Sequence, residues 1–138
     1  MLTQILIGLA VVAAGMYLTG RMKMRRLSQS GVAMAEAQAL HDLLVTGAKP
    51  VMIDVREPAE FTSALGHIKG ARNIPLGAIA RRAAEVSTAK DQPVYVICRS
   101  GQRATAAAGQ LSQAGYTKVL ILNGGMLAWQ RAGYAMDH

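Results

Sequence analysis

The sequence predicts an α/β fold, in which a parallel β-sheet has helices on both faces and follows one transmembrane helix. First, short apolar runs at Val51–Ile53, Val94–Ile97 and Val119–Leu122 alternate with helical patterns, as in strands joined by crossover helices. Second, these runs are continuously apolar, which is typical of parallel strands buried on both faces. Third, Leu2–Gly20 contains no charged residue and has the length of a membrane span.

The elements follow one another as alternating helices and strands. Gly47 and Pro50 end the first helical pattern, and Pro58 stands in the first turn of the second. A region of about 105 residues is enough for one such core, and no internal repeat is present. The predicted helices cover 32–46, 58–65, 76–86, a stretch from Arg103 onward and 126–132, and the predicted strands cover 51–53, 71–74, 94–97 and 119–122.

The N-terminal stretch predicts three parts: a signal-anchor helix over 1–20, a basic juxtamembrane linker over 21–31 and a domain over 32–138. As a helix, Leu2–Gly20 would be about 28 Å long, close to the thickness of a bilayer core. Arg21–Arg26 adds four positive charges, which favour the cytoplasmic side. We therefore expect a single-pass protein of the bacterial inner-membrane type, with its N-terminus outside and its domain in the cytoplasm. A cleaved secretory signal, which carries its charges before the apolar stretch, and a buried soluble helix are the alternatives.

The excess of basic over acidic residues supports this division into anchor, linker and domain. The net charge is +7, from fifteen basic and eight acidic residues, and four of the basic residues lie in the linker, where they would attract anionic lipid. Nucleic acid is not an expected partner, because none of the few aromatic residues is interleaved with the basic run. The lipid bilayer is the expected large partner.

Cys98 is the most informative residue, because it is the only cysteine and stands between the strand at 94–97 and a helical pattern. Ligands of open α/β sheets bind outside the carboxyl ends of the strands, and a helix N-terminus favours negative charge. Arg99 and Arg103 add positive field, so the thiolate, which is the nucleophile, is favoured. The alternative is a small buried apolar residue. No disulfide is possible within the chain, and the three isolated histidines predict neither a metal site nor a cofactor.

Four sequence blocks in order resemble the rhodanese family of sulfurtransferases. Cys98–Arg103 (CRSGQR) resembles the family's active loop, and the other blocks are Asp54–Phe61 (DVREPAEF), Gly66–Pro75 (GHIKGARNIP) and Leu122–Met126 (LNGGM) with Trp129 and Gly133. Together they cover about Met34 to Tyr134. The resemblance implies a rhodanese-like sheet with helices on both faces.

The resemblance also implies a chemistry. Cys98 would take the outer sulfur of a small anionic donor, such as thiosulfate or a persulfide, and pass it to a thiol, a protein or another thiophilic acceptor. The donor and the persulfide would be bound by the loop residues, which are Arg99, Ser100, Gly101, Gln102 and Arg103. Oriented backbone amides form such anion sites elsewhere, and a planar guanidinium can hold two oxygens of an oxyanion.

Other residues are expected to support the site. Asp54 follows the strand at 51–53 and would approach the loop, and Arg56 would form an ion pair with Glu57 or Glu60 that fixes the following helix. His67 is expected to be a hydrogen-bonded structural histidine, and Trp129 to pack in the core.

Two other functions remain open from the sequence. Phosphatases and arsenate reductases that share the fold have a cysteine loop one residue longer, whereas Arg103 here follows Cys98 by five positions. The shorter loop favours a sulfur atom over a tetrahedral phosphate. A non-catalytic binding module at the membrane is the other alternative, and the intact cysteine and arginines argue against it.

Overall fold

Within residues 31–138, the part of the chain that the computed structural model describes, five parallel strands form one sheet in the order β1-β5-β4-β2-β3. The strands are β1 (Val32–Ala35), β2 (Val51–Asp54), β3 (Arg72–Asn73), β4 (Val94–Ile97) and β5 (Val119–Leu122). The central strand β4 pairs with β2 and β5, in a register that places Asp54 beside Ile97. The α/β fold class and its parallel sheet are therefore confirmed.

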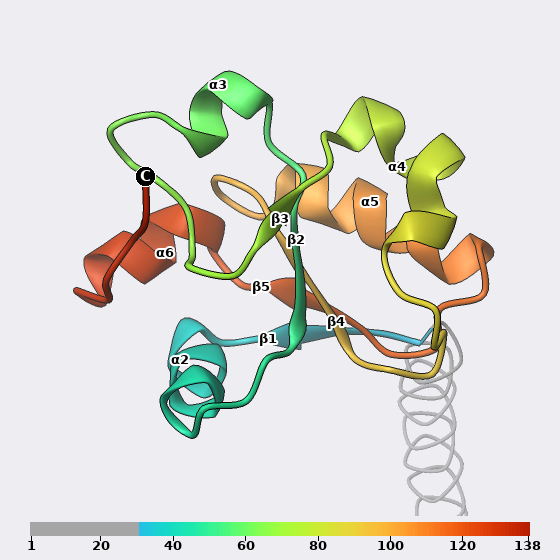
Figure 1. Cartoon of the computed structure of the whole chain (residues 1–138), viewed down its shortest axis with the longest axis horizontal. Helices are drawn as coiled ribbons and strands as arrows, with labels where there is room; N and C mark the ends of the chain where they lie inside the picture. The colour runs from blue at the N-terminus through green and yellow to red at the C-terminus, as the bar shows by residue number, and fades with distance from the viewer. Residues whose placement is uncertain (1–30) are drawn as a thin grey trace, which may run out of the picture. The chain divides into compact units, whose positions relative to one another are not determined.

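Helices cover both faces of the sheet (Figure 1). They are α2 (Ala37–Val45), α3 (Pro58–Phe61), α4 (Leu76–Arg82), the 3-10 turn η1 (Ala83–Glu85), α5 (Gln102–Gln113) and α6 (Gly125–Arg131). The predicted anchor over 1–20 and the linker up to Ser30 lie outside the described residues. Among residues 31–138, no helix combines the length and the apolar character that a membrane span requires.

Two hydrophobic clusters, one on each face, hold these layers together. Along β4, Val94 and Val96 point to the cluster under α4 and α5, whereas Ile97 points to the cluster under α2 and α6. This alternation is the expected consequence of the two-residue period of a strand. Residues 31–138 thus form one compact unit with its own core.

The predicted helix over 32–46 is wrong in its first part. Val32–Ala35 is strand β1, which pairs in parallel with β5 so that Val32 lies beside Val119; only Ala37–Val45 is helical. Ala33 and Ala37 continue the apolar period of the helix toward the N-terminus, and for this reason the sequence predicts a helix that begins too early. Pairing with β5 overrides that local preference, because strand preference depends on the neighbouring strand more than on the residue itself.

The second helix is shorter than predicted, since α3 ends at Phe61 instead of residue 65. The hydroxyls of Thr62 and Ser63 donate to the carbonyls of Pro58 and Glu60, and such side-chain bonds compete with continued helix. The predicted strands at 51–53, 71–74, 94–97 and 119–122 and the remaining helices are present, with ends that differ by a few residues.

Candidate active site

Cys98 directly follows the central strand β4 and opens the loop that leads into α5. The residue is only 1 % exposed, because its side chain belongs to the cluster under α4 and α5. Arg99, Ser100 and Gln102 are exposed, and Gly101 and Arg103 are partly buried. The thiol thus lies at the base of a loop whose crest faces solvent.

One backbone amide of this loop binds the sulfur, and four others have no backbone acceptor within residues 31–138. The amide of Gly101 donates to the Sγ atom of Cys98 across 2.9 Å. Within residues 31–138, the amides of Arg99, Ser100, Gln102 and Arg103 have no backbone acceptor, as expected where a loop enters a helix. Unpaired amides and the N-terminal end of the helix dipole together favour an anion at this position.

Two glycines make this loop geometry possible. Gly101 has a φ of 118° at the N-cap of α5, a conformation that residues with a Cβ rarely adopt. Gly125 opens α6 directly against the loop: a Cβ there would lie 2.3 Å from the carbonyl oxygen of Cys98. The close approach lets the amides of Met126 and Leu127 bind the carbonyls of Cys98 and Arg99 across 2.8 and 3.1 Å. The start of α6 therefore fixes the backbone of the cysteine.

Gly125→Ala is expected to disturb the active loop. The new Cβ would have to displace the Cys98 carbonyl, so we expect a loss of about 2 kcal/mol in the free energy of unfolding or more, together with a lower kcat for any reaction at Cys98. Gly133→Ala is the matched control, because Gly133 has a similar φ of +78° and open space at its Cβ position. Denaturant unfolding gives the stability of both variants, and steady-state kinetics give their kcat. A Gly125→Ala protein as stable and as active as Gly133→Ala would contradict this role of α6.

Asp54 and Arg56 form a buried ion pair beneath the site. Their side chains are 0 and 1 % exposed, and Arg56 Nη2 lies 2.8 Å from Asp54 Oδ2. Arg56 also donates to the carbonyls of Gly66, at 2.7 Å, and Glu60, at 3.3 Å. The pair thus connects the end of β2, which lies beside β4, to α3 and to the turn at Gly66.

Arg103 forms an ion pair with Glu60 of α3. Its two terminal nitrogens lie 2.6 and 2.9 Å from the two carboxylate oxygens of Glu60. Hydrogen bonding to Arg103 lowers the pKa of Glu60 to about 2, and the same bond raises the pKa of Arg103. The prediction that Arg56 forms an ion pair with a nearby glutamate is therefore wrong: Arg56 takes Asp54 as its ionic partner and reaches only the backbone of Glu60.

The low pKa of Glu60 predicts a pH dependence of stability. Because the folded-state pKa of about 2 lies below the usual 4.5, the pair stabilises the protein above pH 4.5, and this stabilisation is lost as the pH falls through about 2. Both side chains are about one-third exposed, so solvent screens the pair and Glu60→Gln should cost only about 0.5 kcal/mol. Melting temperatures of both proteins across the acid range test this, and a gap that widens toward pH 2 would contradict it.

Arg99 is exposed, and no ion pair within residues 31–138 includes it. It borders a cavity of about 400 Å³. The cavity is lined by Arg56, Ala59, Glu60, Ser63, Ala64, Leu65 and Arg99. This space beside the active loop is large enough for a small anionic molecule.

The remaining predicted residues have structural contacts. His67 stacks on Phe61 and its Nδ1 atom lies 2.7 Å from the Phe61 carbonyl oxygen, which confirms a hydrogen-bonded structural histidine. Trp129 is 2 % exposed and packs in the cluster under α2 and α6, as predicted.

Sequence reasoning missed Asn73, whose side-chain amide donates to the carbonyls of Asp54 and Arg56 at 3.0 and 2.8 Å. Its place in the block Gly66–Pro75, after a run of turn residues, was the only signal available.

The profile of the family described as "Rhodanese-like domain" matches residues 36–132. The uncharacterized protein YqhL of Bacillus subtilis is 46 % identical over 81 residues, which are 59 % of this chain and 61 % of that protein, so the match leaves more than a third of that relative uncovered. A sulfurtransferase of Allochromatium vinosum is 38 % identical over 98 residues, which are 71 % of this chain and 88 % of that protein.

Among solved structures, a rhodanese-related protein from Thermoplasma volcanium superposes with a TM-score of 0.62 at 30 % identity. The superposition covers 75 % of this chain and 95 % of that one, so the matched fold makes up almost a whole protein there. Residues 31–138 likewise form a compact unit with its own core, so we expect this domain to fold without the preceding segment. With a family profile that spans the chain from α2 to α6 and includes the cysteine loop, the chain belongs to the rhodanese-like domain family.

Proposed function

We propose that this protein is a sulfurtransferase that moves sulfane sulfur through a persulfide on Cys98. The observation that carries this proposal is the position of the thiol, at the carboxyl end of the central strand and 2.9 Å from the Gly101 amide, at the base of a loop of unpaired amides. Membership of the family and the A. vinosum relative named sulfurtransferase support the same reaction class.

The proposed first step is a displacement at sulfur. The Cys98 thiolate attacks the outer sulfur of thiosulfate, a new S–S bond forms, and the bond to the sulfonate sulfur breaks with release of sulfite. An acceptor such as cyanide or a thiolate then attacks the outer sulfur of the persulfide, and the electron pair of the S–S bond returns to Cys98. The loop amides would stabilise the negative charge of the persulfide. The leaving groups carry their own charge, so the reaction needs an electrostatic environment more than a proton donor.

The two loop arginines would contribute differently. Arg103 already has Glu60 as its ionic partner, so Arg103 would mainly hold α3 against the loop. Arg99 borders the cavity without an ionic partner among the described residues and would attract the donor anion.

Arg99→Gln is therefore expected to raise KM for thiosulfate roughly fivefold with a smaller change in kcat. The matched control is Arg81→Gln, which removes an exposed arginine of α4 and should leave KM unchanged. Steady-state kinetics at low and high salt measure both, and added salt should reduce the difference. Equal KM values for the two variants would contradict the role of Arg99.

A steady-state assay with several substrates tests the proposed reaction class. We expect the domain over residues 28–138 to convert thiosulfate and cyanide to sulfite and thiocyanate, and to show no turnover of p-nitrophenyl phosphate or arsenate. Turnover of the phosphate ester alone would assign the protein to the phosphatases that share the fold. No turnover with thiosulfate, polysulfide or a small-molecule persulfide would favour a non-catalytic binding module.

We also propose that the full chain is anchored in a membrane by residues 1–20, with the catalytic domain in the cytoplasm. The support is sequence alone: an uncharged apolar stretch of about bilayer length, followed by four positive charges. The anchor would restrict the enzyme to acceptors that reach the membrane surface, and the basic linker would attract anionic lipid.

Cell fractionation tests the anchor. The full chain is expected in the membrane fraction, extractable with detergent but not with high salt or alkaline carbonate, and a chain that lacks residues 1–27 is expected in the supernatant with the same sulfurtransferase activity. A full chain that stays in the supernatant without detergent would contradict the anchor and leave the reaction class unaffected.

A further inference from the structure

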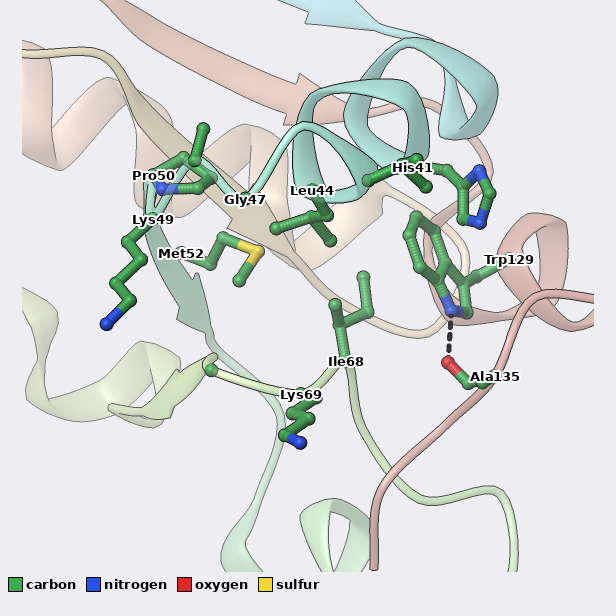
Figure 2. A pocket seen from close by; sticks show the side chains of 13 residues that line it. His41, Leu44, Gly47, Lys49, Pro50, Met52, Ile68, Lys69, Trp129 and Ala135 are labelled. Carbon is green, nitrogen blue, oxygen red and sulfur yellow. Dashed lines mark hydrogen bonds between the residues drawn. The ribbon is translucent and has the colours of Figure 1, made fainter.

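A second cavity lies away from the cysteine loop, between α2, the start of β2 and the segment around Ile68 (Figure 2). Its volume of about 540 Å³ falls within the range of about 300–1,000 Å³ that is usual for small-molecule sites. No residue of Cys98–Arg103 lines it. The cavity is therefore distinct from the proposed sulfur-transfer site, and we call it the α2 groove.

The floor of the α2 groove is apolar. Leu44, Met52 and Ile68 meet there, and Trp129 borders the same space. Met52 and Ile68 are 3 and 1 % exposed, so both are fixed by packing beneath the floor. Val45 also lines the groove and is 71 % exposed, so it adds accessible apolar surface.

One wall of the groove includes His41 and Trp129, which belong to an aromatic cluster with Tyr134. His41 stacks on Tyr134 with ring centroids 3.8 Å apart, and both rings meet Trp129 edge to face. The indole nitrogen of Trp129 donates to the carbonyl of Ala135 across 3.0 Å (Figure 2). This bond satisfies the polar atom of the indole, and Trp129, which is 2 % exposed, borders the groove with little free surface of its own.

The charged residues of the lining are all cationic. Lys49 and Lys69 border the groove, and no carboxylate does. Both lysines are exposed, and no ion pair or side-chain hydrogen bond within residues 31–138 involves either ammonium group. Two unpaired cations beside an apolar floor are complementary to a ligand that is itself apolar at one end and anionic at the other.

We propose that the α2 groove binds a small amphiphilic carboxylate. Its apolar chain would lie along Leu44, over the floor that Met52 and Ile68 form, and its acid group would be attracted by the ammonium groups of Lys49 and Lys69 at the rim. Burial of the chain provides most of the affinity, in proportion to the apolar area removed from water. The two ammonium groups select the anion over a neutral molecule of the same shape.

Trp129 is the only tryptophan in the chain and borders the groove, so a change in its emission is the readout. The experiment titrates the domain over residues 28–138 with decanoate below its micelle concentration, and isothermal calorimetry measures the same binding independently. We expect a saturable change in Trp129 emission. Lys49→Gln with Lys69→Gln should raise Kd roughly tenfold, and decan-1-ol, which has the same chain without the charge, should bind wild type more weakly by a similar factor.

Two further variants separate the groove from general effects. Arg81→Gln with Lys118→Gln removes the same charge from exposed positions that do not line the groove, and it should leave Kd unchanged. Ala48→Phe adds a ring to a residue that lines the groove and should weaken binding strongly, while near-ultraviolet circular dichroism and thermal unfolding show that the variant is folded.

Three results would overturn the proposal. The first is no saturable emission change and no heat with decanoate. The second is a Kd that is equal in the two double variants or equal for decanoate and decan-1-ol. The third is a response to anionic phospholipid vesicles but not to dissolved decanoate, which would assign this surface to a membrane. None of these results depends on whether Cys98 transfers sulfur, so the failure of one proposal leaves the other intact.

Discussion

Cys98→Ser is expected to abolish sulfur transfer, with kcat for thiosulfate at least about a thousandfold below that of the native domain. The expected loss follows from the chemistry of the step. Sulfur transfer needs an atom that attacks sulfur as an anion and then holds a second sulfur in a bond that a later nucleophile can break. A serine hydroxyl at the same place is far less acidic and less nucleophilic toward sulfur than the thiol.

The fold should tolerate this substitution, which makes the result interpretable. Serine differs from cysteine by one atom, and the loop is held by its backbone through the amides of Met126 and Leu127. Near-ultraviolet circular dichroism and thermal unfolding of the variant would show that the domain is folded. Cys98→Ala serves as a second variant without any hydroxyl. If either folded variant kept more than a small fraction of the native kcat, Cys98 would not be the sulfur carrier.

Asp54→Asn is expected to cost about 3 kcal/mol in the free energy of unfolding, the largest stability effect we expect from a single isosteric change. Asp54 and Arg56 are almost completely buried. Removing one charge of a buried pair leaves the other in a poorly solvated environment, which costs more than the pair itself contributes. Arg56 also holds the carbonyls of Glu60 and Gly66, so a displaced guanidinium would loosen α3 beside the active loop.

The control for this prediction is an exposed pair of the same kind. Arg82 Nε lies 2.9 Å from Glu85 Oε2, and both side chains are more than one-third exposed. Glu85→Gln should therefore change stability little, because water screens such a pair. Chemical denaturation of both variants gives the comparison. An Asp54→Asn protein no less stable than Glu85→Gln would contradict the structural importance of the buried pair.

The sequence predicted the parts of the fold that depend on local pattern. The strands at Val94–Ile97 and Val119–Leu122 are continuous apolar runs, and the helix that follows the cysteine loop has a clear period. By contrast, Val32–Ala35 forms a strand only because β5 lies beside it, and a contact between segments so far apart leaves little trace in the local sequence. Whether this segment forms a strand therefore depends on its pairing with β5 and not on its own sequence pattern.

The same distinction applies to the candidate site. The position of Cys98 at a strand end before a helix was predictable, because three consecutive patterns meet there. The ionic partners of Arg56 and Arg103 were not predictable from the sequence. Glu60 is close to Arg56 in the sequence, yet the buried Asp54 takes the guanidinium of Arg56 and Glu60 pairs with Arg103, 43 positions away. The α2 groove was also invisible in the sequence, because α2, Ile68 and Trp129 meet only in the folded chain.

The most direct test of the central claim is the mass of the intact domain after reaction with a sulfur donor. The domain over residues 28–138 is incubated with thiosulfate, separated from the excess and weighed by mass spectrometry beside Cys98→Ser. We predict a gain of one sulfur atom in the native domain only, which cyanide or dithiothreitol removes, as expected of a persulfide. A native domain that gains no sulfur from thiosulfate, polysulfide or a persulfide, or a Cys98→Ser variant that gains as much, would contradict sulfur transfer through Cys98.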